Sequence, residues 1–373
     1  MSPAPGSFPG GRPALPASDR SHMMARSSWN ARAFLAEQGT GGDVAEFETV
    51  MMTPMPPLVV EGLTSVCTLH KLWDAADREC ALAELAPRVR AIATAAGGER
   101  LDGAAMARFP NLKIVASFGV GYDHVDAAWA GAHGVVVTNT PDVLNDEVAD
   151  TAMGLILCTV RQLPQADRFV RAGRWLEGPF PLTASLRGRT LGILGLGRIG
   201  RTIARRAEAF GMRVVYHGRR PQHDVSYPYA PTPSALAHAC DILVAITPGG
   251  ADTHHIVNAD VLEALGPNGI FINVARGSVC DQDALIAALR NRKIMSAGLD
   301  VFADEPKVPR DLLEMEHVVL LPHVGSGTNH TRDAMSRLVV DNIASFIRGG
   351  APLTPVAETP WPPAARMSQA DAG

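Results

Sequence analysis

The sequence lacks the features that mark membrane proteins and nucleic-acid-binding proteins. Its longest apolar run, from Ala152 to Val160, ends at Arg161 and is less than half as long as a segment that spans a bilayer. The chain carries 34 basic and 38 acidic residues, for a net charge of −4, so no basic field points to nucleic acid. We therefore expect neither a membrane nor a nucleic acid as a partner.

Cysteine is also scarce. The chain has 5 cysteines in 373 residues, and none of them has the C-x-x-C spacing of zinc or thioredoxin-type sites. No metal site is therefore expected. Scattered thiols in apolar surroundings predict a cytoplasmic protein with buried, reduced cysteines. The five are Cys67, Cys80, Cys158, Cys240 and Cys280.

The two ends of the chain lack apolar periodicity. Residues 1–43 are rich in Pro, Gly, Ser, Ala and Arg, and they contain no apolar core of a secretory signal. A disordered extension, a mis-assigned start codon upstream of Met51 or Met52, and an Arg-containing transit peptide remain as alternatives. The composition predicts disorder for residues 1–50 and for the tail, residues 357–373.

Between these ends, short apolar runs alternate with helical patterns, which is typical of α/β proteins with parallel sheets. A chain of 373 residues exceeds one ordinary core, so two domains are expected. Gly211 is placed to end a helix, and Asp281 is placed to cap the start of another. Strands are predicted at residues 58–60, 91–94, 114–117, 135–139, 190–194, 212–216, 242–246, 270–274, 296–300 and 318–321, and helices at 146–172, 199–210, 259–265 and 282–292.

The segment "TLGILGLGRIG" is an apolar strand followed by a glycine-rich turn and a helix. Gly195 permits the tight turn, Gly197 lets the backbone approach a pyrophosphate, and Gly200 permits close helix–strand packing. The helix start then offers free N–H groups to the phosphates. This arrangement predicts a Rossmann-type dinucleotide site, with a purely structural turn as the alternative.

The next predicted strand lacks the acidic residue that usually binds the adenosine ribose. The segment "MRVVYHGRR" instead ends in Gly218, Arg219 and Arg220. Two guanidinium groups suit a 2′-phosphate dianion, so we expect NADPH as the cofactor and NADH as a weaker alternative. A solvated basic loop is the other interpretation.

Three later segments place polar residues at the C-terminal end of an apolar strand or in the loop that follows it, at the sheet edge where α/β proteins bind ligands. These residues are Arg276 in "FINVARG", Glu305 in "GLDVFADEP" and His323 in "LLPHVGSG". Arg276 can hold a carboxylate and polarise a ketone. His323 can donate a proton near neutral pH, and Glu305 can orient its imidazole and favour the protonated form. With a hydride from the nicotinamide, this set predicts reduction of a 2-keto acid.

These motifs, with "FPNLKIVASFGVGYDHVD" and "NTPDVLNDEVADTAMGLIL", resemble the D-isomer-specific 2-hydroxyacid dehydrogenases, in the same order from about Met52 to about Val356. The chain looks most similar to the glyoxylate/hydroxypyruvate and hydroxyphenylpyruvate reductases, which favour NADPH. The resemblance implies a Rossmann-type doubly wound parallel sheet (residues 148–325) inserted in a discontinuous flavodoxin-like substrate domain (residues 51–147 and 326–356), and a homodimer.

The resemblance also implies roles for individual residues. Backbone N–H groups of Val120 and Gly121 bind the substrate carboxylate together with Arg276. Asn145 and the run "TPGGADTHH" depart from the family's pattern, so contacts there are not carried over. The implied cofactor-binding residues are Gly195, Gly197, Arg198, Ile199, Gly200, Gly218, Arg219, Arg220, Thr247, Pro248, Val274, Ala275, Asp300 (at the carboxamide) and Gly325.

Three other functions compete with this one. A dinucleotide-sensing binding protein, such as the corepressors that resemble this family, could keep all three polar residues. A formate dehydrogenase is disfavoured because Pro322, and not Gln, precedes His323. A serine hydrolase is excluded because Val324 stands where the G-x-S-x-G frame around Ser326 needs glycine.

Overall fold

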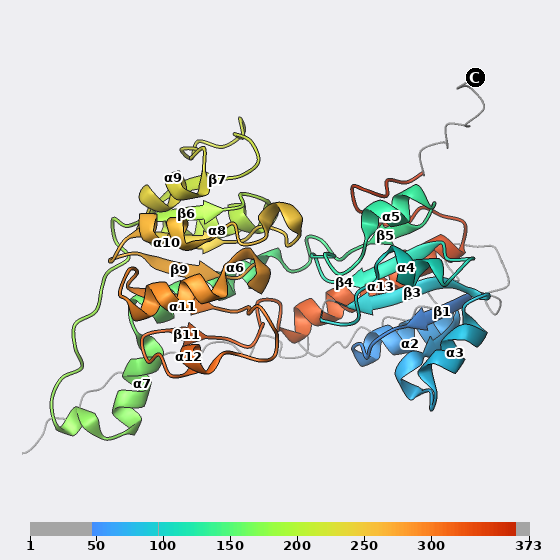
Figure 1. Cartoon of the computed structure of the whole chain (residues 1–373), viewed down its shortest axis with the longest axis horizontal. Coiled ribbons are helices and arrows are strands. Elements are labelled where there is room, and N and C mark those ends of the chain that lie inside the picture. Colours follow the sequence, from blue (N-terminus) through green and yellow to red (C-terminus); the bar gives the residue numbers. More distant parts are fainter. Residues whose placement is uncertain (1–46, 96, 363–373) are drawn as a thin grey trace, which may run out of the picture. The chain divides into compact units, whose positions relative to one another are not determined.

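The computed structural model of the chain describes residues 47–95 and 97–362. They form two β-sheets, each flanked by helices (Figure 1). Every pairing between neighbouring strands of these sheets is parallel. The predicted α/β class with parallel sheets is confirmed.

The first sheet has the strand order β2–β1–β3–β4–β5, which is the flavodoxin-like order 2-1-3-4-5. Its strands are β1 (Glu48–Met51), β2 (Thr68–Lys71), β3 (Val89–Ala95), β4 (Ile114–Phe118) and β5 (Val136–Thr138). The helices beside it in Figure 1 are α2 (Pro57–Val66), α3 (Arg78–Leu85), α4 (Gly103–Ala107), α5 (Ala127–Ala132) and α13 (Asn329–Ile347). The last helix, α13, packs against α2 and β4, so late residues return to the first sheet.

The second sheet has the strand order β11–β10–β9–β8–β6–β7. Its strands are β6 (Thr190–Leu194), β7 (Arg213–His217), β8 (Ile242–Ala245), β9 (Ile270–Asn273), β10 (Ser296–Leu299) and β11 (Val319–Leu320). The chain leaves β6 for β7 on one side and then crosses to β8 on the other. The ends of β6 and β8 therefore form the switch point where dinucleotides bind in Rossmann-type sheets.

Helices cover both faces of the second sheet because its strands are apolar on both faces. Alternate residues of β8 enter two separate hydrophobic clusters: Leu243 and Ala245 enter one, and Ile242 and Val244 enter the other. The helices of this region are α6 (Asn145–Val160), α7 (Leu163–Arg171), α8 (Arg198–Ala209), α9 (Pro233–His238), α10 (Ala259–Leu265), α11 (Gln282–Arg290) and α12 (Arg310–Leu313).

The predicted limits of disorder are wrong at both ends of the described chain. Strand β1 begins at Glu48, inside the predicted extension, and pairs with β2 on one side and β3 on the other. It was missed because a four-residue strand carries little periodicity. In the predicted tail, the buried Thr359 hydroxyl accepts the Val137 N–H at 2.9 Å. Residues 1–46 and 363–373 lie outside the described residues, and the predictions for them stay predictions.

Two predicted elements are also wrong. Residues 58–60 belong to helix α2 and not to a strand, because Pro57 starts a helix that an apolar run alone does not reveal. The predicted helix 146–172 is two helices, α6 and α7. Gln162 adopts a left-handed φ of 51° between them, and Pro164 cannot continue the preceding helix.

Other local predictions are confirmed. The bounds of β6 and α10 are those predicted. Gly211 has a φ of 73° after α8, and the Asp281 carboxylate accepts the Ala284 N–H at 3.1 Å. The expectation of buried thiols holds for Cys67 and Cys280, but it is wrong for Cys80, which is exposed. Among the described residues, no helix combines the length and apolarity needed to cross a membrane.

Candidate active site

The glycine-rich turn joins β6 to α8 at the switch point. Gly195 has a φ of 108°, and a Cβ there would lie 2.8 Å from the Ile246 carbonyl oxygen. A Cβ on Gly200 would collide with the Gly195 carbonyl. Gly197 caps α8 without a side-chain bond, and its Cβ position has no atom within 4 Å. The start of α8 therefore has no side-chain cap, and its first N–H groups could bind a phosphate.

The loop after β7 presents the two arginines. Arg219 and Arg220 are both exposed, and neither forms an ion pair with any described residue. The loop itself is tied down, because the Gln222 N–H donates to the Tyr216 hydroxyl at 2.7 Å and Arg201 pairs with Asp224 at 2.8 Å. Two unpaired guanidinium groups therefore stand on a fixed loop.

His323 and Glu305 form a direct pair. The imidazole Nδ1 lies 2.7 Å from Glu305 Oε2, and both side chains are about one-third exposed or slightly more. Burial acts to raise the pKa of Glu305, but hydrogen bonds from His323 and the Phe302 N–H, with nearby Arg276, hold it below its usual value. Glu305 is therefore an ionised partner for His323, whose Nε2 is left for another group.

Asp300 fixes the backbone that carries His323. Its carboxylate accepts the Val324 N–H at 2.7 Å and the Gly325 N–H at 2.9 Å, and its carbonyl accepts the His323 N–H at 2.9 Å. His323 has a φ of 53°, which costs a non-glycine residue about 1–3 kcal/mol. Burial raises the pKa of Asp300, although the hydrogen bonds from these N–H groups act to lower it. Asp300 thus holds a strained histidine in place.

Two residues that the sequence did not single out position Arg276. Asn273 accepts the Ala275 N–H at 3.0 Å and donates to the Arg276 carbonyl at 3.1 Å, which closes the turn after β9. A Cβ on Gly277 would collide with the Phe302 carbonyl, so only glycine lets this turn touch the loop that carries Glu305. Neither a hydrogen bond within one turn nor a close backbone approach produces a recognisable pattern of residues in a single sequence.

The loop after β4 supplies the predicted substrate N–H groups. Gly119 is held from both sides by Thr140, and the Val120 carbonyl accepts the Asn139 amide at 2.8 Å. Within the described part of the chain, the N–H groups of Val120 and Gly121 have no acceptor. A Cβ on Gly121 would collide with the Arg276 guanidinium. The loop and the guanidinium therefore adjoin.

Apart from Arg198 and Ile199, which lie in α8, the remaining predicted cofactor residues follow strands of the second sheet. The Thr247 hydroxyl oxygen is buried and has no hydrogen-bond partner among the described residues. Thr247 also lies beside Gly195, 3.0 Å from its Cβ position. Arg198 pairs with Asp142 at 3.2 Å. Pro248 follows β8, Val274 and Ala275 follow β9, and Gly325 lies in the loop after β11.

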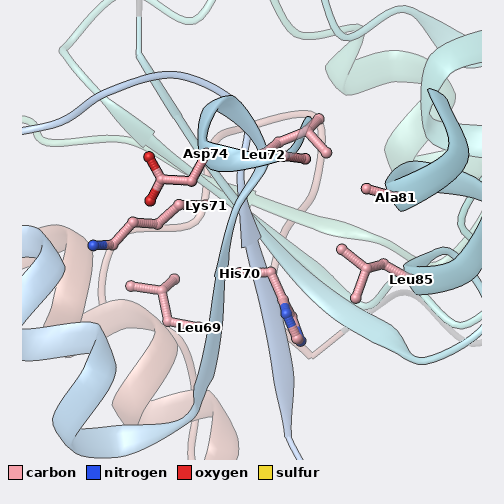
Figure 2. A pocket seen from close by; sticks show the side chains of 8 residues that line it. Leu69, His70, Lys71, Leu72, Asp74, Ala81 and Leu85 are labelled. Atoms are coloured by element: carbon pink, nitrogen blue, oxygen red, sulfur yellow. The ribbon is translucent and has the colours of Figure 1, made fainter. Parts of the chain in front are cut away.

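A separate hollow of about 440 Å³ lies at the edge strand β2 (Figure 2). Its polar His70 side chain already bonds to Glu48 at 2.8 Å, and Glu48 also pairs with Arg88 at 2.7 Å. None of its lining residues belongs to the predicted site, so the hollow is not the candidate active site. The lining residues are Leu69, His70, Lys71, Leu72, Asp74, Ala75, Ala81 and Leu85.

A glycine-rich turn at a Rossmann switch point, beside an Arg and a His–Glu pair at neighbouring strand ends, defines an NAD(P)-dependent oxidoreductase. The model of the D-isomer specific 2-hydroxyacid dehydrogenase NAD-binding domain matches residues 153–325. Over 307 residues the chain is 44% identical to a glyoxylate/hydroxypyruvate reductase A of Arabidopsis thaliana, covering 82% of this chain and 98% of that protein. The chain belongs to the D-isomer specific 2-hydroxyacid dehydrogenase family.

Two further relatives agree. A hydroxyphenylpyruvate reductase of Plectranthus scutellarioides is 43% identical over 311 residues, covering 82% of this chain and 98% of that protein. The crystal structure of an NADPH-dependent glyoxylate/hydroxypyruvate reductase of Sinorhizobium meliloti with NADP and malonate has a TM-score of 0.80 and 51% identity, covering 85% of this chain and 98% of that one. The predicted family and enzyme class are confirmed, and the cofactor is a nicotinamide dinucleotide.

Proposed function

We propose that the protein reduces small 2-keto acids, such as glyoxylate and hydroxypyruvate, to D-2-hydroxy acids with NADPH. The observation that carries this proposal is the 2.7 Å His323–Glu305 pair, which leaves a proton donor at the strand ends beside Arg276. The relatives named as glyoxylate and hydroxypyruvate reductases support the choice of substrate.

In this mechanism the chain's own residues bind the keto acid and supply a proton. Arg276 and the N–H groups of Val120 and Gly121 hold the carboxylate, and the guanidinium polarises the ketone. The bound nicotinamide supplies the hydride. His323 Nε2 donates the proton to the developing alkoxide, while ionised Glu305 stabilises the charge and orientation of the imidazole.

The proposed preference for NADPH rests on the loop after β7. Arg219 and Arg220 are exposed and unpaired within the described residues, at the place where an acid would exclude a 2′-phosphate. The turn residues of the glycine motif would hold the pyrophosphate. The Sinorhizobium relative, described as NADPH-dependent, binds NADP. Asp300 would meet the carboxamide, with Thr247, Pro248, Val274, Ala275 and Gly325 along the nicotinamide side.

We propose the domain limits inferred from the sequence, with the cofactor domain at residues 148–325.

We also propose that the protein is a homodimer. Support for the dimer comes from α7 and the segment after it. Helix α7 buries no residue, and Trp175, Leu176 and Leu182 are 68%, 96% and 102% exposed. Such an apolar surface marks a contact between proteins. Sedimentation of wild type and of a Leu176→Glu, Leu182→Glu variant tests it: the variant should be monomeric.

The substrate is tested by initial rates over a panel of keto acids, each with NADPH and NADH. We expect turnover of glyoxylate or hydroxypyruvate, faster with NADPH. A protein that binds NADPH and turns over none of the panel would be a dinucleotide sensor, and the proposed function would be wrong.

The cofactor preference is tested with the Arg219→Ala, Arg220→Ala variant. A charge-assisted contact contributes roughly 1.5–3 kcal/mol, so NADPH should bind on the order of ten- to a hundredfold more weakly. NADH should be nearly unaffected because it lacks the dianion. Equal losses for both cofactors would show that the arginines form only a solvated loop.

A further inference from the structure

Arg276 carries an ion pair that the reduction itself does not require. Its Nε lies 3.2 Å from Oδ1 of Asp123, which stands in the loop after β4. The Arg276 side chain is 25% exposed and that of Asp123 is 33% exposed. The pair is therefore shielded from solvent more than ordinary surface ion pairs, which contribute little.

The pair fixes the guanidinium in one orientation. Nη1 donates to the Ala275 carbonyl at 2.7 Å, and Nη2 lies against Gly121, where a Cβ would collide. With Nε held by Asp123, the plane cannot turn without losing a hydrogen bond. The guanidinium therefore stays beside the loop whose Val120 and Gly121 N–H groups are free of acceptors within the described chain.

Gly249 leaves room for the pair. A Cβ at this position would lie 3.2 Å from Arg276 Cγ and 3.2 Å from the carboxylate of Asp123. That spacing is tighter than ordinary van der Waals contact, so a larger residue would press on both partners at once. Gly249, the first glycine of "TPGG", is thus matched to the ion pair.

Asp123 also changes the charge of the site. Arg276 is the cation that would receive the keto acid's carboxylate, and the Asp123 carboxylate lies against it. Asp123 therefore offsets part of the attraction that Arg276 exerts on anions. A second carboxylate on the tail of a keto acid would meet this negative charge.

We propose that Asp123 is a positioning residue for Arg276 and that its charge selects keto acids with a single carboxylate. The inference rests on the proposed function, since it requires Arg276 to bind the keto acid. Asp123→Asn keeps the shape but removes the charge. Asp126→Asn is the matched control, because Asp126 caps α5 through the Trp129 N–H at 2.9 Å and asparagine caps equally well.

Steady-state kinetics should compare hydroxypyruvate, with one carboxylate, and oxaloacetate, with two. In Asp123→Asn, kcat for hydroxypyruvate should fall about tenfold with KM within about twofold, because orientation is lost while attraction remains. The ratio of kcat/KM for oxaloacetate to that for hydroxypyruvate should rise about five- to tenfold. The Asp126→Asn ratio should equal that of wild type.

Calorimetric titration of the NADP⁺ complexes adds a readout that needs no turnover. Malonate, a dianion, should bind Asp123→Asn about fivefold more tightly than wild type, and glycolate, a monoanion, should change less. Equal malonate affinity in wild type and Asp123→Asn would overturn the inference, as would an unchanged substrate ratio. A wild-type protein that reduces no keto acid would instead overturn the proposed function, and the malonate comparison would still decide the role of Asp123.

Discussion

At the scale of single residues, the account depends on the shape of Arg276 as well as on its charge. In Arg276→Lys the cation remains, but the bidentate fork and the bond to Asp123 are lost. We expect kcat/KM for the keto acid to fall by about a hundredfold or more, with NADPH affinity and the free energy of unfolding retained. Steady-state kinetics and cofactor titration measure this, and an unchanged kcat/KM would remove Arg276 from the proposed site.

The Glu305–His323 pair predicts a change in the pH profile. Hydrogen bonding to His323 helps to hold the pKa of Glu305 below its usual value. The Glu305 carboxylate lies 2.7 Å from the imidazole Nδ1 of His323. Glu305→Gln removes this negative charge beside the proton donor, so the alkaline limb of kcat/KM should move to lower pH.

Asp304→Asn is the control for this experiment, because Asp304 is an exposed neighbour that pairs only with Lys307 among the described residues. Its profile should overlay that of wild type. If the Glu305→Gln profile also stayed in place, the pair would not govern the proton that is transferred.

At the scale of elements, α13 carries a carboxyl that the fold disfavours in its charged form. Asp341 Oδ1 is buried without a hydrogen-bond partner in the described chain. Burial raises the pKa of Asp341 to about 6, although the positive charges of Arg348 and Arg337 act to lower it. The folded state therefore binds this proton more tightly than the unfolded chain does. The stability that this bound proton contributes is fully present below the usual Asp pKa of 3.8, and it is lost as pH rises through about 6.

Asp341→Asn should therefore stabilise the protein at neutral pH and change little in acid. Allowing for the solvent that reaches a half-buried group, we expect about 1 kcal/mol above about pH 7. Denaturant unfolding of wild type and Asp341→Asn, once above about pH 7 and once in acid, measures the difference in the free energy of unfolding. Asp333→Asn, at an exposed position of the same helix, should show no such pH dependence, and a stabilisation of Asp341→Asn that was equal at both pH values would contradict the burial argument.

Strand β1 predicts where the chain can be shortened. Val50 and Met51 are fully buried between β2 and β3, and burying such a side chain contributes about 1.5–3 kcal/mol. A variant without residues 1–46 should unfold cooperatively and keep its activity, whereas one without residues 1–52 should not fold. Circular dichroism and activity measure both, and a folded shorter variant would contradict the central place of β1.

The sequence predicted elements where local signals were strong. The apolar run of β6 and the helical pattern of α10 were found with their bounds, because the local pattern of apolar residues is clear there. Strand β1 and the break at Gln162 were not found, since tertiary pairing and a left-handed residue decide them. In the site, strand ends revealed Arg276, Glu305 and His323. Asn273 acts through hydrogen bonds within one turn, and Gly277 and Asp123 act through contacts between loops far apart in sequence. Neither kind of contact can be recognised in a single sequence.

At the scale of the whole molecule, the central claim is that this chain transfers a hydride and a proton to a keto acid. The most direct measurement is turnover of hydroxypyruvate with NADPH by wild type and His323→Ala, with analysis of the product's configuration. We predict one NADPH consumed per D-2-hydroxy acid formed by wild type. His323→Ala should bind NADPH normally and form no product. NADPH binding without turnover by wild type, or an L-product, would contradict the account.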